Sequence, residues 1–179
     1  MPKMPGFRDY LRYANKCIMA AEDAIQQQED AEWLLIPAII LAWSAMESFV
    51  NNRCDDLKSL PVDMFELHER ALLLEKRLRF VDSGVNIGKF DLEGNEYQAL
   101  ENKIFFLLSK MGSKDASDLK GGALWNRFQA FKDVRNGLIH PRKDKEIKLE
   151  IKNVIDFIET AKELIQVISE RIWKTRLDL

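Results

Sequence analysis

The segment from Leu34 to Val50 is the most hydrophobic part of the chain and constrains the fold more than any other stretch. Pro37, Ser44 and Glu47 interrupt it, so its uninterrupted apolar part is far shorter than the ~20 residues that a bilayer-spanning helix needs. Such a segment is typical of a helix buried inside a protein. We therefore expect no membrane association, a cytoplasmic location and a bundle in which this helix is central.

Apolar residues recur at spacings of three and four along most of the chain, which predicts helices. The predicted helices cover about 10–28, 32 or 38 to 57, 63–80, 96–111, 123 to 136 or 140, and 146–174. The glycine-rich and polar stretches 82–94 and 112–122 predict loops, the first with room for a short extended turn, and we predict no strand. The 179 residues therefore predict an all-α fold, a single-domain helical bundle of about five to six helices that spans residues 1–179.

Charge and cysteine content exclude several classes of protein. A formal net charge of -2 argues against a surface that binds nucleic acid non-specifically, so any RNA contact must be confined to a site. Cys17 and Cys54 lack the spacing of zinc ligands and are too few for a disulfide framework, which indicates two reduced core thiols. The sequence contains no phosphate-binding glycine loop, dinucleotide fingerprint or zinc-protease motif, so we expect no cofactor and no metal.

The stretch Asp133–Pro141 holds the candidate chemistry, because one of the two histidines of the chain, His140, lies in it. Histidine can exchange protons near neutral pH, and the permanent charge of Arg135 can hold two phosphate oxygens. Asn136 can orient a hydroxyl or an imidazole, and on a helix it shares a face with His140. Arg135 lies about 140° away from His140 around the helix. Two copies related by a two-fold axis would instead pool two arginines and two histidines in one cleft.

Arg135, Asn136 and His140, near the end of the penultimate long helix of a small all-α chain, resemble the HEPN superfamily (higher eukaryotes and prokaryotes nucleotide-binding). The signature of that family is an arginine, roughly four to six further residues and a histidine, with a polar residue directly after the arginine. Pro141 is also familiar at this place. A weaker resemblance lies in Ser44–Asn51, where an apolar run is followed by a glutamate and an asparagine. The similar helical order covers about Ala38 to the C-terminus.

The resemblance implies a metal-independent endoribonuclease that acts as a homodimer on RNA, in phage defence or in a toxin–antitoxin system with an antitoxin protein as partner. It implies that His140 acts as general base on the ribose 2′-hydroxyl or as acid on the leaving oxygen, and that Arg135 stabilises the phosphorane-like transition state. Asn136 would orient the scissile phosphate or the histidine. In the subgroup that pairs with nucleotidyltransferase antitoxins, a modifiable tyrosine follows the histidine by two residues. Arg142 stands there in this chain, so that modification is not expected.

Residues outside the motif allow two interpretations each. Glu47 and Asn51 share a helical face and either orient the Arg135 region or form a solvated helix end. Arg142, Lys143 and Lys145, with Lys148, either contact the RNA backbone or form a solvated loop. We expect His68 to be structural, and the spacing of Trp125, Phe128 and Phe131 to mark a packing stripe instead of a base-stacking platform.

Two rival functions stay open at this point. A non-catalytic HEPN-like helical module would bind a nucleotide or a partner protein without cleaving RNA. A metal-dependent hydrolase would use Glu47, Asp55 and Asp56, but no histidine–carboxylate spacing supports it. Cleavage of RNA measured with and without a chelator separates all three.

Overall fold

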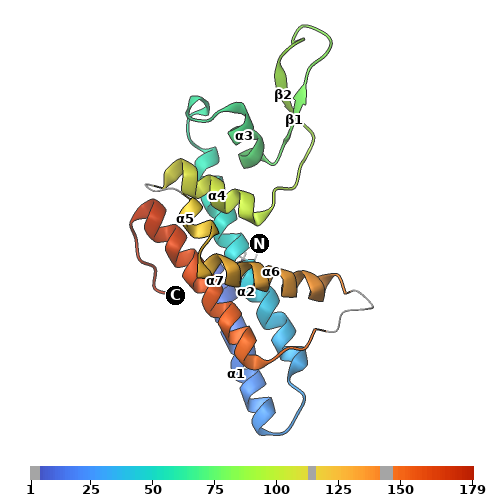
Figure 1. The fold of residues 1–179 in the computed structure, drawn as a ribbon, viewed down its shortest axis with the longest axis vertical. Coiled ribbons are helices and arrows are strands. Elements are labelled where there is room, and N and C mark those ends of the chain that lie inside the picture. The colour runs from blue at the N-terminus through green and yellow to red at the C-terminus, as the bar shows by residue number, and fades with distance from the viewer. Residues whose placement is uncertain (1–4, 113–115, 142–146) are drawn as a thin grey trace.

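The computed structural model describes residues 5–112, 116–141 and 147–179. Within these ranges the chain forms seven α-helices, one 3₁₀ turn and one antiparallel pair of strands (Figure 1). The predicted all-α class is confirmed, with the strand pair as an addition. The elements in chain order are α1 (Phe7–Gln26), α2 (Glu32–Lys58), the 3₁₀ turn η1 (Val62–Met64), α3 (Leu67–Leu74), β1 (Arg77–Phe80), β2 (Phe90–Glu93), α4 (Leu100–Met111), α5 (Ser117–Lys120), α6 (Ala123–Ile139) and α7 (Ile151–Trp173).

Helix α2 lies at the centre of the bundle, as its apolar sequence predicted. It packs along α1 and α7 and also contacts α3, α4 and α6. Twelve of its side chains are buried, among them Ile39, Met46 and Val50. By length and composition alone α2 is apolar enough to cross a membrane, and half of its most apolar 18-residue stretch is buried inside the bundle. The helix continues through Pro37 and begins at Glu32, the earlier of the two predicted starts.

Aromatic side chains of α6 pack against the middle of α2 and fix the position of the candidate motif. The ring of Trp43 stacks on Phe128 with centroids 5.6 Å apart and meets Phe131 edge-on at the same separation. Trp125 packs against Phe128 at 4.8 Å. All four rings are buried, so the predicted packing stripe is confirmed and these side chains offer no surface for stacking RNA bases.

The third predicted helix is wrong in its second half. Helix α3 ends at Leu74, because Glu75 adopts the left-handed conformation with a φ of 51°. Residues 77–80 then form β1, which pairs with β2 in a region that we predicted as a loop. Arg79 pairs with Glu93 across the strands, and Glu75 pairs with Lys103 of α4.

Two other helices are shorter than predicted, and one is new. Helix α4 begins at Leu100 instead of Glu96, and α7 begins at Ile151 instead of Glu146. The single turn α5 lies inside the second predicted loop. Helix α6 extends to Ile139, so the longer of its two predicted forms is closer to the structure.

Candidate functional site

Arg135 is held on the surface of α2 by an aromatic ring and an amide. Its guanidinium carbon lies 5.3 Å from the centroid of the Trp43 ring, the geometry of a cation–π contact. One terminal nitrogen donates to Oδ1 of Asn136 at 3.1 Å. The Nε atom is buried and has no hydrogen-bond partner in the structure. These contacts orient the guanidinium while they leave part of its donor capacity unused.

No carboxylate of the described residues forms an ion pair with Arg135. Asp133 and Glu150, which sequence proximity makes the obvious candidates, are both exposed, and neither forms an ion pair with Arg135. A half-buried cation without a counter-charge is costly to maintain. An anion from outside the chain, such as a phosphate, would therefore bind Arg135 without displacing an internal partner.

His140 lies at the C-terminal end of α6 with an exposed side chain. Its backbone N–H still donates to the carbonyl oxygen of Asn136 at 2.9 Å, and its own φ of -122° and ψ of 68° take the chain out of the helix. Because α6 reaches Ile139, Asn136 and His140 stand about one helical turn apart, the spacing that places two side chains on one face of a helix. The Oδ1 atom of Asn136 accepts a hydrogen bond from Arg135. The amide NH2 of Asn136 forms no hydrogen bond with the described residues.

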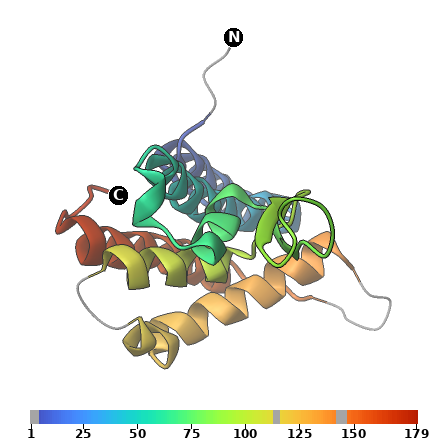
Figure 2. The same cartoon turned by 90° about the horizontal axis from the view of Figure 1, so that it is seen from above.

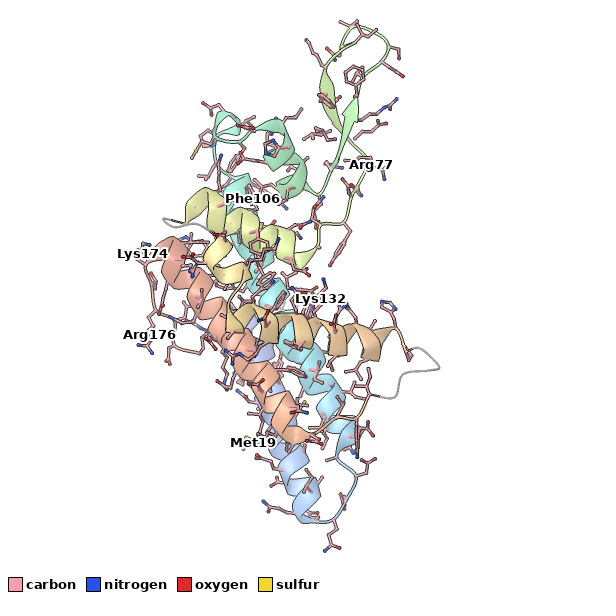
Figure 3. The ribbon with its side chains drawn as sticks, in the orientation of Figure 1. Met19, Arg77, Phe106, Lys132, Lys174 and Arg176 are labelled. Carbon is pink, nitrogen blue, oxygen red and sulfur yellow. The ribbon has the colours of Figure 1, made fainter. Side chains whose placement is uncertain are left out.

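Helix α6 is fixed on both sides of the motif. One turn before Asn136, Lys132 pairs with Glu101 near the start of α4, and Figure 3 shows Lys132 on the side of α6 that faces α4. Gly137 permits a close approach on another side, since a Cβ atom there would lie 2.4 Å from Cδ1 of Ile147. The motif therefore stands on a helix end that is packed in place and not on a loose terminus.

Glu47 and Asn51 lie in a polar groove between α2, α3 and α4, with a volume of about 430 Å³. Oδ1 of Asn51 accepts a hydrogen bond of 2.8 Å from Nζ of Lys103, and the same Nζ lies 2.6 Å from Glu75. Glu47 comes one helical turn after Trp43 on α2, a rise of ~6 Å. No described contact joins Glu47 or Asn51 to Arg135, so their orienting role stays a prediction.

Lys103 is the residue of this groove that sequence analysis missed. Only 8% of it is exposed, although lysine is rarely buried without a partner. The signal was present in the sequence, because Lys103 stands in the buried stripe of α4 beside Ile104 and Leu107. Burial raises the pKa of the neighbouring Cys54 thiol to about 11, an effect that Lys103 and Lys58 partly offset. Cys54 therefore stays protonated near neutral pH and is a poor nucleophile.

The remaining candidate residues have different outcomes. Arg142, Lys143 and Lys145 lie outside the described residues, and Lys148 is exposed. His68 is exposed on α3 with its ring 3.3 Å from the Glu66 carboxylate.

Two of the three carboxylates named for a metal-dependent hydrolase, Asp55 and Asp56, are engaged by cations. Asp55 pairs with Lys58, and Asp56 pairs with Arg53. Among the described residues, no three His, Cys, Asp or Glu side chains converge in a way that could hold a metal ion. The metal-dependent alternative thus gains no support from this part of the chain.

Comparison of the chain with protein-family models, with curated proteins and with solved structures finds no match in any of the three. The resemblance to the HEPN superfamily accordingly depends on Arg135, Asn136 and His140 and on the order of the helices.

Proposed function

We propose that this chain is a metal-independent endoribonuclease of HEPN type that acts as a homodimer. The observation that carries the proposal is the state of Arg135, whose guanidinium is half-buried, oriented by Trp43 and Asn136, and free of any described carboxylate. It stands on the same helix end as the exposed imidazole of His140. Phosphodiester cleavage needs a group that transfers protons and a positioned cation that stabilises the charge of the transition state.

The proposed reaction is transesterification within the RNA strand. The neutral imidazole of His140 from one copy removes the proton of the ribose 2′-hydroxyl, and the 2′-oxygen forms a bond to phosphorus. The bond from phosphorus to the 5′-oxygen breaks, and the protonated imidazole of His140 from the second copy gives its proton to that oxygen. The products are a 2′,3′-cyclic phosphate and a 5′-hydroxyl, with no net change in protons.

The other two residues of the motif act on the phosphate. Arg135 stabilises the extra negative charge of the phosphorane-like transition state, and the amide NH2 of Asn136 donates to a non-bridging oxygen. Arg135 and His140 point from different faces of α6, so one copy does not focus both on a single phosphate. A two-fold dimer supplies the arginine of one copy opposite the histidine of the other.

On this proposal the protein works in the cytoplasm, in phage defence or in a toxin–antitoxin system, and an antitoxin protein would cover the motif. Arg142, Lys143 and Lys145 follow the motif directly and would hold the RNA backbone. The overall charge of -2 fits an enzyme whose RNA contacts are confined to this end of α6.

Purified protein incubated with labelled RNA and an excess of EDTA tests the proposal. We expect cleavage with cyclic-phosphate ends, and a loss of about 10²–10⁴-fold in the His140→Ala variant. The matched control is His68→Ala, which removes the other histidine of the chain and should leave the rate unchanged. Intact RNA from a folded protein, or equal losses in the two variants, would rule out the nuclease.

The polar groove of Lys103 favours a second candidate, the non-catalytic module that binds a nucleotide. Its volume of about 430 Å³ lies in the range of small-ligand sites, and it presents carboxylates, amides and lysines together. Calorimetric titration with nucleoside monophosphates would detect such binding. Binding that is lost in Asn51→Ala and kept in His140→Ala would support this candidate and separate it from the nuclease site.

A further inference from the structure

The hairpin of β1 and β2 projects from one end of the bundle (Figure 1) and has two different faces. In its register Leu78 pairs with Leu92 and Phe80 with Phe90. Arg77 and Arg79 pair with Glu93 and Asp91 at the alternating positions. Because successive side chains of a strand point to opposite faces, one face carries the four apolar residues and the other carries the four charged ones. We call the first the apolar face of the hairpin.

The bundle does not cover the apolar face. Phe80 and Phe90 remain 53% and 54% exposed, although their rings contact each other edge-on with centroids 5.4 Å apart. Val85 and Ile87 are exposed at the apex of the hairpin. A two-stranded hairpin is marginally stable on its own, and a contiguous exposed apolar patch marks an interaction surface.

Hydrogen bonds and two glycines fix the conformation of the hairpin that carries the apolar face. Val81 and Lys89 extend the strand pairing, with a hydrogen bond of 2.8 Å from the N–H of Val81 to the carbonyl of Lys89. Gly84 and Gly88 both have a φ of 82°, which other residues rarely adopt, and they shape the turn. The apolar face is thus a built feature of the fold and not a loose loop.

We propose that the apolar face of the hairpin docks against the same face of a second copy of this chain. The charges of residues 77–93 favour this occupant, because three cations (Arg77, Arg79, Lys89) balance three anions (Asp82, Asp91, Glu93). A neutral hairpin does not repel its own copy, and it offers no surplus of positive charge to an RNA backbone. Arg79 is in addition held by Glu93.

The short, charged strands favour packing of the two hairpins through their apolar faces over pairing through their edges. Both free edges belong to four-residue strands with charged side chains, which is how proteins suppress edge-to-edge pairing. An antiparallel two-fold arrangement instead places the leucine pair of one copy on the phenylalanine pair of the other. Large side chains then meet smaller ones, and all four charged residues of each hairpin stay in water.

The hairpin and the C-terminal end of α6 lie on the same side of the bundle in both views (Figures 1 and 2). Docking through the hairpins would therefore join two copies by an element on the side of the bundle that carries the Arg135–His140 end. In this respect the inference extends the proposed function by naming the surface that makes its dimer. The argument for the apolar face does not use the motif, so the two can fail independently.

Cysteine crosslinking on neighbouring residues tests the docked face. Leu78→Cys places a thiol on the apolar face, and Arg79→Cys places one on the charged face one residue away. With a short bifunctional maleimide we expect at least about tenfold more crosslinked dimer for Leu78→Cys, since packed sheets bring facing side chains within ~10 Å. Wild-type protein gives the background from Cys17 and Cys54. Equal crosslinking of the two variants would overturn the proposal.

Charge variants test the same face without a crosslinker. In the antiparallel arrangement Phe80 of one copy faces the leucine pair of the other, so we expect Phe80→Glu and Leu78→Lys each to weaken dimerisation by more than about a hundredfold in sedimentation or light scattering, because each buries unpaired charges twice in a two-fold dimer. Mixing the two variants should restore a dimer by pairing glutamate with lysine. A dimer that persists in Phe80→Glu, or the absence of a dimer in wild-type protein, would refute the proposal.

Two further outcomes separate the proposed self-docking from RNA binding by the hairpin and from the nuclease proposal. If Phe80→Glu leaves the oligomeric state unchanged and abolishes binding of single-stranded RNA, the apolar face serves RNA, and the proposed self-docking is wrong. If the dimer depends on Phe80 and wild-type protein still cleaves no RNA, the docking surface stands and the nuclease proposal fails.

Discussion

Two cations packed on α2 differ in how the protein treats their charge. Lys103 is almost fully buried, a carboxylate of the chain neutralises it, and an amide oxygen accepts a hydrogen bond from it. Arg135 is half-buried and receives a ring and an amide but no described carboxylate. Among the described residues, the chain thus supplies Lys103 with a counter-charge and supplies Arg135 with none. On the proposed function, Arg135 is kept available for an external anion, whereas Lys103 stabilises the fold.

Replacing Arg135 should give the largest effect on activity. We expect Arg135→Met to lower kcat/KM for RNA cleavage about 10²–10³-fold, because transition-state charge loses its main partner. The free energy of unfolding should change by less than ~1 kcal/mol, since the variant removes a desolvated charge together with its cation–π contact. Urea denaturation and initial rates measure the two quantities. A large loss of stability without loss of activity would make Arg135 a structural residue.

Lys103→Met should show the opposite pattern. We expect it to lower the free energy of unfolding by about 1–2 kcal/mol, because Glu75 and Asn51 lose their partner while Glu75 can still reach water. RNA cleavage should stay within about twofold of wild type. If Lys103→Met instead abolishes cleavage in a stable protein, the groove belongs to the active site and the contrast between the two cations disappears.

The two amides allow a matched pair of smaller changes. Asn136→Ala should lower cleavage about tenfold, the value of one hydrogen bond to a charged group, and leave stability nearly unchanged. Asn51→Ala removes the equivalent bond to Lys103 and should lower stability by about 1 kcal/mol without an effect on cleavage. Identical consequences in the two variants would contradict the assignment of separate roles.

Lys110 provides the smallest test, because it is a more exposed cation of α4 paired with Glu69 at 2.7 Å. Burial alone would raise the pKa of Glu69, but hydrogen bonds from Lys110 and from the Glu66 backbone outweigh it and lower this pKa. The pair is therefore fully effective above the usual glutamate pKa and is lost as the pH falls through the lowered value. We expect Glu69→Gln to cost about 0.5 kcal/mol at neutral pH, and the difference from wild type to vanish in acid.

The helices were predictable wherever local periodicity and burial agree. The stripe of Leu11, Ala14, Ile18 and Ala21 on α1 and the apolar body of α2 are both buried as expected. The strands were missed because the leucines from 67 to 78 also fit a helical stripe, and no glycine or proline marks the end of α3 at Glu75. The alternation in Arg77–Phe80 and Phe90–Glu93 was the available signal, on either side of a glycine-rich turn.

The site was only partly predictable, for a related reason. The spacing of Asn136 and His140 on one helix face follows from the sequence, because it depends on one helix alone. The contact of Arg135 with Trp43 and that of Lys103 with Asn51 join residues far apart in the chain. Such contacts depend on how the helices pack, which no local pattern encodes. That no described carboxylate pairs with Arg135 therefore became visible only in three dimensions.

The chain enters and leaves the hairpin at nearly the same point. Glu96 donates its N–H to the carbonyl of Glu75 at 2.8 Å, and Lys76 donates to Asn95 at 2.8 Å. These two hydrogen bonds close the base of the hairpin, so the packing of the helices does not depend on the length or sequence of the hairpin beyond them. Descendants of this gene can lengthen, trim or exchange the projecting arm without redesigning the helices, and an engineer can graft a reporter at Val85 for the same reason.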